Sequence, residues 1–143
     1  MNRYFTDLSS LKSAFKKTLA HATNNMSKKV LDKVDEEFMN YYLDYNPLVY
    51  NRTGAMSYVP KKTDAILSGN SVNAEVFLDT DYDYDVGNWS GKEVIESANQ
   101  GLHGGQDLGT GDVKVWDNPI NEIDSNSHAM WAESLKKAGL NVK

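Results

Sequence analysis

The feature of this 143-residue chain that most limits its fold is a long stripe of apolar residues near the start. Successive members lie three or four residues apart, the spacing that lines up one face of an α-helix. Thr6 or Asp7 can cap its start, and Asn46-Pro47 ends it, because a residue before proline is disfavoured in the helical conformation. We therefore expect one amphipathic helix over about residues 7–45. The stripe consists of Leu8, Leu11, Phe15, Leu19, Ala22, Met26, Val30, Val34, Phe38, Tyr42 and Tyr45.

This helix would be unusually long for so short a chain. Uninterrupted, it would extend about 57 Å at ~1.5 Å per residue. The polar segment Thr23–Ser27 is its weakest part, where a kink is the expected alternative to a continuous helix. A domain of this size does not easily cover such a length, so part of the stripe is expected to pack on another chain.

The segments after the long helix indicate short strands. Residues 55–59, AMSYV, have the pattern of a strand that Pro60 stops. The next segment, residues 61–71, is expected to form a loop or a short turn of helix. Residues 72–86 then alternate strictly, which predicts a strand with its apolar face inward and its acidic face in water, bent near Asp79-Thr80. A further short strand is expected at residues 113–116, VKVW.

Two more helices complete the expected fold. Ser90 and Glu93 have the spacing of a capping box, which predicts the start of a short helix. Gly101 provides the stop of that helix. The last helix is expected to begin at Ser125 or Ser127 and to cover about residues 126–138. The sequence therefore predicts one α+β domain over residues 1–143: a long N-terminal helix packed on a small antiparallel sheet, with the strands and the short middle helix at about 55–116, and a C-terminal helix.

Composition excludes several classes of protein. Apolar residues make up 40% and charged residues 24% of the chain, as in a globular protein. No apolar run approaches the ~20 residues of a membrane span, and the first residues do not resemble a signal peptide. The chain contains no Cys, so it can form neither a disulfide framework nor a thiolate site. A cytoplasmic origin fits this composition.

Charge is unevenly distributed. Residues 1–34 carry seven Lys or Arg and two Asp, whereas residues 35–143 carry eight Lys or Arg and eighteen acidic residues. One interpretation is a solvated basic helix face beside an acidic body. The other is head-to-tail complementarity, in which the basic helix of one subunit meets the acidic surface of the next. A DNA-binding role through Lys28 and Lys29 is a weaker option, because arginine and interleaved aromatic residues are scarce there.

Chemical motifs are weak or missing, and we expect no catalytic, cofactor or metal site. The aspartates of residues 79–85 fit no register of an EF-hand loop, and the glycine-rich residues 101–112, expected to form a mobile loop, fit no phosphate-binding pattern. His103 in that loop would need an orienting carboxylate and a nucleophile to act as a base. Asp107 and Ser97 are near it in sequence, but no characteristic spacing links the three residues.

The segment after the long helix has a structural interpretation. Tyr50 can pack on the helix end, Arg52 can bond to carboxylates or to the last helical carbonyls, and Gly54 permits a positive φ in a turn. Such a connector can also lie next to an interface.

The order of these features resembles a known family. A long helix runs into NPLVYNRTGAM, then come the strand with DYDYDV, the LHGG loop and a last helix ending LKKAGLNV. This order is similar to that of the small neck or tail-completion proteins of long-tailed phages and prophages of Gram-positive bacteria. Met56 after the turn and DYDVGNW after the strand depart from the family pattern, in which Leu and a Tyr-Val-Glu-x-Gly-Thr-like stretch are common.

The resemblance implies a non-catalytic virion protein. It would form a ring, hexameric or dodecameric, that joins the capsid to the tail around the DNA channel, after assembly in the host cytoplasm. Its partners would be neighbouring connector, tail terminator or tail tube proteins, with DNA passing through unbound and no membrane involved. The interface residues expected from this are Tyr50, Arg52, Thr53, Gly54, Leu102, His103, Gly104 and Gly105. The alternative is a small soluble ligand-binding or hydrolytic protein with a site near His103.

Overall fold

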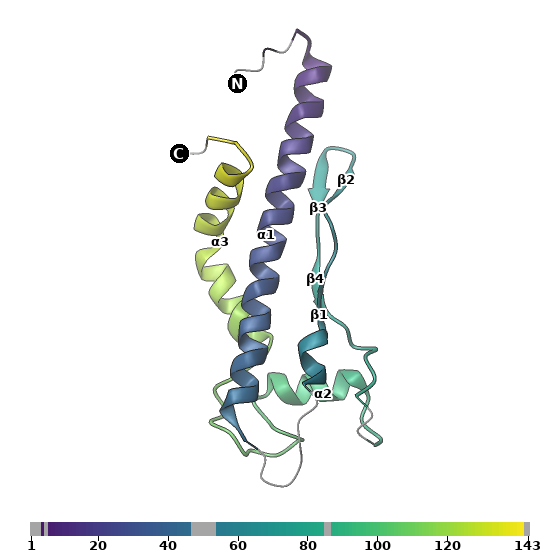
Figure 1. Cartoon of the computed structure of the whole chain (residues 1–143), viewed down its shortest axis with the longest axis vertical. Coiled ribbons are helices and arrows are strands. Elements are labelled where there is room, and N and C mark those ends of the chain that lie inside the picture. Colours follow the sequence, from purple (N-terminus) through teal and green to yellow (C-terminus); the bar gives the residue numbers. More distant parts are fainter. Residues whose placement is uncertain (1–3, 5, 47–53, 85–86, 142–143) are drawn as a thin grey trace.

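A computed structural model describes residues 4, 6–46, 54–84 and 87–141 of the chain, and the fold is α+β (Figure 1). A long helix α1 forms the axis of the molecule, and the other elements are arranged around it. The elements are α1 (Leu8–Asp44), the 3₁₀ turn η1 (Ala55–Tyr58), β1 (Pro60–Lys62), β2 (Ile66–Ser68), β3 (Ser71–Asn73), β4 (Val76–Leu78), α2 (Gly91–Asn99) and α3 (Asp117–Lys137).

Helix α1 confirms the prediction of one long helix. It is 37 residues long and continues through Asn24-Asn25 without a break, so the expected alternative of a kink there is not observed. Asp7 caps its start, accepting a hydrogen bond of 2.8 Å from the backbone N–H of Ser10. The polar residues within it have tertiary partners. Asn24, for example, accepts a hydrogen bond of 2.8 Å from the backbone N–H of Ala65.

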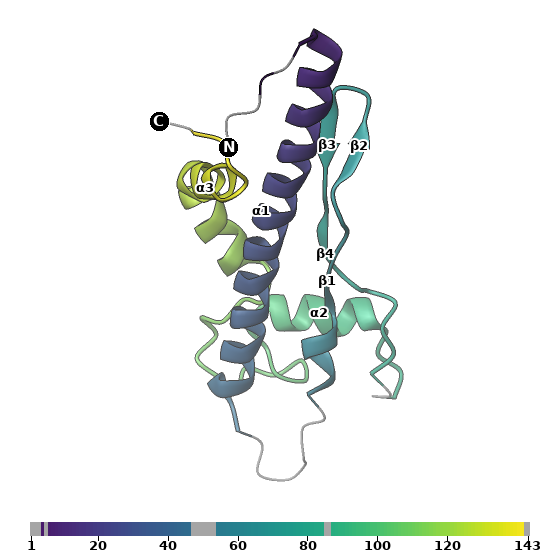
Figure 2. The same ribbon diagram turned by 45° about the horizontal axis from the view of Figure 1, so that its top comes forward.

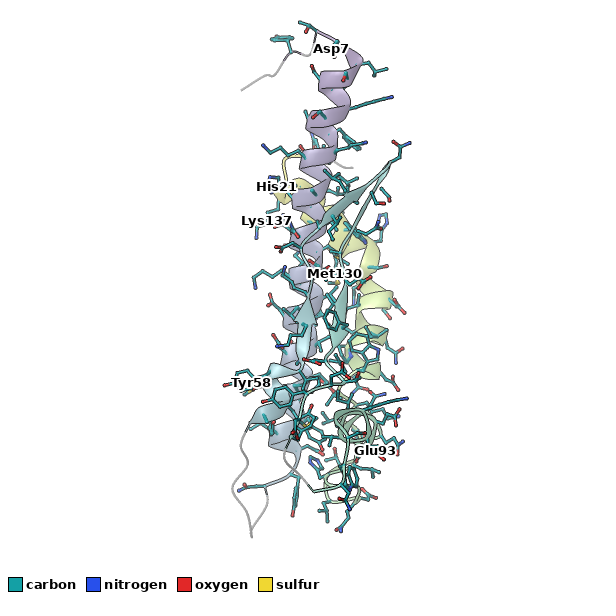
Figure 3. All side chains as sticks on the ribbon, turned by 90° about the vertical axis from the view of Figure 1, so that its right-hand side faces the viewer. Asp7, His21, Tyr58, Glu93, Met130 and Lys137 are labelled. Carbon is teal, nitrogen blue, oxygen red and sulfur yellow. The ribbon has the colours of Figure 1, made fainter. Side chains whose placement is uncertain are left out.

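Helix α3 packs lengthwise along one side of α1 (Figures 1 and 3). Met26 of α1 and Ile123 and Met130 of α3 form a small apolar cluster, which Val30 and Ile120 extend. Ion pairs border it: Lys29 contacts Glu133 at 2.6 Å, and Lys33 contacts Glu122. Because α3 is shorter than α1, it leaves the N-terminal turns of α1 uncovered. In Figure 3, Lys137 lies at the level of His21, far from Asp7.

A narrow β ribbon lies on another side of α1 (Figures 1 and 2). β1 pairs antiparallel with β4, with Lys61 opposite Phe77, and β2 pairs antiparallel with β3, with Leu67 opposite Val72. Two polar contacts attach the ribbon to α1, namely the Ala65–Asn24 hydrogen bond and a bond of 2.8 Å from Lys16 Nζ to the carbonyl oxygen of Gly69. The ribbon thus flanks the half of α1 that α3 covers least.

The main core lies at the C-terminal end of α1, where α2 crosses beneath the ribbon (Figure 2). Its fully buried centre brings together Phe38 and Val34 of α1, Val59 after η1, Ala98 of α2 and Val115 before α3. The capping box of α2 is present as predicted, since Ser90 and Glu93 satisfy each other's backbone N–H groups. Gly101 ends this helix with a φ of 75°.

Two predicted strands have other structures. Residues 55–58 form η1, entered through Gly54 at a φ of 71°, so the predicted strand at 55–59 is wrong while the predicted positive φ of Gly54 is confirmed. Residues 113–116 are not a strand either. Val115 has no strand partner there and is buried among the helices instead.

The alternating segment is broken over its described residues, 72–84, although its apolar side does face inward there, and residues 85–86 lie outside the described residues. Only Ser71–Asn73 and Val76–Leu78 are strands, and the segment predicted as a loop supplies most of β1 and all of β2. Pairing ends where the N–H of Asp79 donates to the carbonyl oxygen of Val59, close to the predicted bend. The following chain passes against the first turn of α2, where Gly91 leaves room for the carbonyl oxygens of Thr80 and Tyr82.

Helix α3 begins about eight residues earlier than predicted. Its cap does not come from Ser125 or Ser127. Asn99 at the end of α2 accepts hydrogen bonds of 2.9 Å from the backbone N–H groups of Trp116 and Asp117. Pro119 is tolerated because the first turn of a helix does not need its N–H. A cap supplied from another helix leaves no local sequence signal.

Replacing Phe38 tests the importance of the main core. Phe38 is 1% exposed, so Phe38→Ala should lower the free energy of unfolding by about 3–5 kcal/mol through lost burial and a residual cavity. Its neighbour Met39 is 55% exposed, and Met39→Ala should change stability by less than about 0.5 kcal/mol. Urea unfolding followed by circular dichroism measures both. Equal losses would contradict this placement of the core.

Candidate functional site

The most strongly connected polar group in the described part of the chain is the carboxylate of Asp44, the last residue of α1. The hydroxyl of Thr110 donates to its Oδ1 at 2.6 Å, and the backbone N–H of Thr110 lies 3.1 Å from both oxygens. Nε2 of His103 lies 3.1 Å from Oδ2. The side chains of Asp44 and His103 are each only 4% exposed. Asp44 therefore fastens the loop after α2 to the end of α1.

Aromatic rings enclose the imidazole of His103. The ring of Tyr41, one helical turn before Asp44, stacks on it with centroids 4.3 Å apart and planes 14° from parallel. Tyr45 lies against it at 5.2 Å. The Tyr41 hydroxyl also donates a 2.7 Å hydrogen bond to the carbonyl oxygen of Leu102. The three residues Tyr41, Asp44 and Tyr45 thus come from one face at the end of α1.

The glycines of the loop have specific positions. His103 and Gln106 form a two-residue hairpin through hydrogen bonds of 2.8 and 3.1 Å, and both central residues, Gly104 and Gly105, have positive φ angles. A turn of this type requires positive φ at both positions. Gly109 lies against the Asp44 carboxylate, where an added Cβ would overlap Oδ2 and approach Nε2 of His103 to 2.8 Å. The loop predicted to be mobile is thus anchored by a buried, hydrogen-bonded site.

The hydrogen bonds of this site favour the charged carboxylate. Mainly the hydroxyl of Thr110, and then His103, hold the pKa of Asp44 below its ordinary value, although burial acts in the opposite direction. A carboxylate on an imidazole is also the orienting half of many catalytic triads. Here the hydroxyl of Thr110 donates a hydrogen bond to Asp44 and not to the imidazole. The imidazole ring of His103 is buried under Tyr41. The arrangement suits a structural tie.

The predicted interface residues fall into two groups. Tyr50, Arg52 and Thr53 lie outside the described residues. The others are described: Gly54 enters η1, Leu102 is half-buried, His103 is buried in the site, and Gly104 and Gly105 form the exposed tip of the hairpin. Their role in an interface stays a prediction, and within the chain it is His103 that makes the most contacts. No sequence signal pointed to Asp44, which lies 59 residues from His103.

A second candidate surface is the N-terminal stripe, defined here as Leu8, Leu11 and Phe15 of α1. These side chains are 65%, 45% and 52% exposed. Their helical phase matches that of Met26, which packs on α3, so the stripe continues the α3-binding face beyond the end of α3. Lys12 is exposed beside it. An apolar face without a cover marks a contact surface.

Comparison with known proteins assigns the chain to a family. A family model named YomN matches residues 7–138, which include every helix and strand described above. The chain belongs to the YomN family. This family is associated with phages and prophages, so the phage origin implied by the resemblance is supported. Searches of curated proteins and of solved structures gave no significant match.

Within the described ranges, no three His, Asp or Glu side chains gather closely enough to hold a metal ion. None of the helices described is both long and apolar enough to cross a bilayer.

Asparagine at position 44 tests the electrostatic part of the tie. At neutral pH, Asp44→Asn should cost about 1–3 kcal/mol, because a charged acceptor of buried hydrogen bonds is lost. The folded pKa of Asp44 lies below the unfolded one. The stabilisation is therefore fully present above the unfolded value of about 4 and is lost as pH falls through the folded value. Urea unfolding of both proteins from pH 7 to pH 3 should show the difference shrinking. The exposed carboxylate of the same loop gives the control, Asp107→Asn. A difference independent of pH would count against the tie.

Alanine at position 109 tests the packing part. Gly109→Ala should destabilise the protein by about 2–3 kcal/mol, because its Cβ would displace the Asp44 carboxylate. Gly104→Ala is the matched variant. Its Cβ meets no atom within 4 Å, so only the positive φ of 59° costs energy, ~1 kcal/mol. Thermal unfolding compares them, and a Gly104→Ala loss equal to that of Gly109→Ala would rule out the steric argument.

Proposed function

We propose that this YomN-family chain is a structural protein of the phage virion, located in the neck or tail-completion region. In this role it forms a ring that joins capsid and tail around the DNA channel. The observation that carries the proposal is the uncovered N-terminal stripe. A helix that extends its apolar face past its own partner within the chain needs a second chain to cover that face.

The charge distribution supports a repeated contact between copies. The basic residues are concentrated in the first 34 residues and the acidic residues in the remainder. Opposite charges on different parts of one chain favour heterologous contacts, which close into rings when the rotation between copies permits. Neighbouring connector, tail terminator or tail tube proteins would contact the faces of this ring.

An acidic body also suits a channel through which DNA moves. Binding to DNA depends mainly on Lys and Arg neutralising phosphates. Residues 79–124 carry eleven acidic residues and two lysines. A channel lined by this part of the chain would let DNA pass without holding it.

The second candidate is a ligand-binding or hydrolytic protein with its site at His103. The contact between Asp44 and His103 favours this second candidate, because Asp44 supplies the orienting carboxylate that His103 would need to act as a base. The burial of both side chains and the stacking of Tyr41 oppose it, because a substrate would have to displace Tyr41 or the loop. This candidate predicts a stable monomer, whereas the ring predicts association.

Light scattering during gel filtration tests the ring. The wild-type chain should form a discrete oligomer as its concentration is raised. The double variant Leu11→Ser, Phe15→Ser should weaken association by about tenfold or more, because each lost apolar contact contributes roughly 1 kcal/mol. Ile66→Ser, Leu67→Ser is the matched control, since this pair is similarly exposed but lies on the β ribbon.

The oligomer result can contradict the proposal in two ways. A wild-type chain that remains a 16.0 kDa monomer at every concentration would oppose the homomeric ring. Association that the ribbon variant weakens as much as the stripe variant would oppose the specific role of the stripe.

A further inference from the structure

We propose that the N-terminal stripe of one copy binds a groove beside α2 on the next copy. This inference rests on the proposed function and names the two surfaces that would meet in the ring. The α2 groove is defined by Trp89, Glu93, Glu96, Ser97, Gln100 and Leu102.

The groove has the size and chemistry to accept apolar side chains from a helix. Its volume is about 250 Å³, below the ~300–1,000 Å³ of most small-molecule pockets. Trp89 and Leu102 supply the apolar wall, and the indole of Trp89 is 44% exposed. The indole rests on Gly105, where an added Cβ would lie 2.8 Å from the ring. This contact fixes the Trp89 ring at the edge of the groove.

The stripe has the spacing that helix-binding grooves recognise. Leu8, Leu11 and Phe15 occupy positions i, i+3 and i+7 of α1, the anchors of an amphipathic helix lying in an apolar groove. All three remain exposed within the chain. A groove of this volume would take one or two of them, and the rest would pack along the surface of α2.

Charge favours this pairing over pairing of two stripes. Lys12 is exposed beside the stripe, whereas Glu93 and Glu96 line the groove. Lys92 reduces the acidity of the groove through its 3.6 Å contact with Glu96, but the surrounding residues 79–124 remain strongly acidic. Two stripes facing each other would place lysines against lysines, which is unfavourable.

One polar group in the groove lacks a partner. The hydroxyl oxygen of Ser97 is buried and has no hydrogen-bond partner among the described residues. Such a group usually costs free energy unless it is satisfied.

The positions of the two surfaces determine the type of contact. Figure 3 shows Asp7, next to the stripe, and Glu93, in the groove, at opposite ends of the molecule. A chain therefore cannot bind its own stripe, and each copy offers one surface of each kind. This heterologous contact produces a ring if it closes and a filament if it does not.

Because the chain contains no cysteine, single introduced cysteines can test the contact directly. Leu8→Cys marks the stripe and Gln100→Cys marks the groove. The two variants are mixed and treated with a short bifunctional maleimide. A species of about 32 kDa, twice the 16.0 kDa chain, should form on a denaturing gel. It should exceed by about fivefold the product of Ser13→Cys mixed with Gln100→Cys, because docking raises the local concentration. Ser13 is exposed on another face of the same part of α1.

A charge reversal provides the second arm. Glu96→Lys, introduced into the Gln100→Cys chain, should lower the cross-linked product about fivefold by repelling Lys12 beside the stripe. Raised salt should lower it as well, since exposed charges are screened. Because charge and salt also change the frequency of collisions, both effects are compared with those on the Ser13→Cys and Gln100→Cys pair, whose product should change less.

The outcomes separate this inference from the proposed function. Cross-linking no greater than in the Ser13→Cys control, in a protein that light scattering shows to be oligomeric, overturns the groove and leaves the ring standing. A dominant homodimer of Leu8→Cys alone overturns it in favour of paired stripes. A monomer without cross-linking overturns both proposals.

Discussion

The structure depends on the length of α1. A 37-residue helix extends about 55 Å at ~1.5 Å per residue, and no other element of the described chain matches it. Its C-terminal half lies in the main core, its middle packs on α3, and its N-terminal turns contact mainly the β ribbon. Each of these three parts of the helix therefore has a different environment. The fold is secured at one end and exposes an apolar face at the other.

The buried site at Asp44 explains how so small a domain secures one end of a long helix. Tyr41 and Asp44 on the last turn of α1, and Tyr45 directly after it, together hold the loop that follows α2. The Thr110 and His103 contacts give that loop a fixed position although it contains five glycines among residues 101–112. The same loop places Gly105 under Trp89. The buried tie and the α2 groove are in this way parts of one structure.

Sequence reasoning predicted the elements that have local signals. The period of the apolar residues predicted α1, Asp7 predicted its cap, and Ser90 with Glu93 predicted the capping box of α2. It failed where the deciding partner is distant. Asn99 caps α3 from another helix, and Asp44 meets His103 from 59 residues away. Alternation over residues 72–86 correctly indicated which side faces inward, but α2 packs across the segment and ends the strand early. No periodic pattern contains that information.

The uneven support of α1 would affect the order of events in the proposed assembly. The first turns of a helix fray when tertiary contacts do not hold them, and local stability then lies far below that of the core. The N-terminal stripe is on such turns, so its amide hydrogens should exchange much faster than those around Phe38. A neighbour that binds the stripe must first bear the entropic cost of ordering these turns, which weakens the first encounter between free chains. Once a pre-ordered edge is available, each further copy adds more readily. A chain built this way would associate only above a threshold concentration, which a pre-ordered edge would lower.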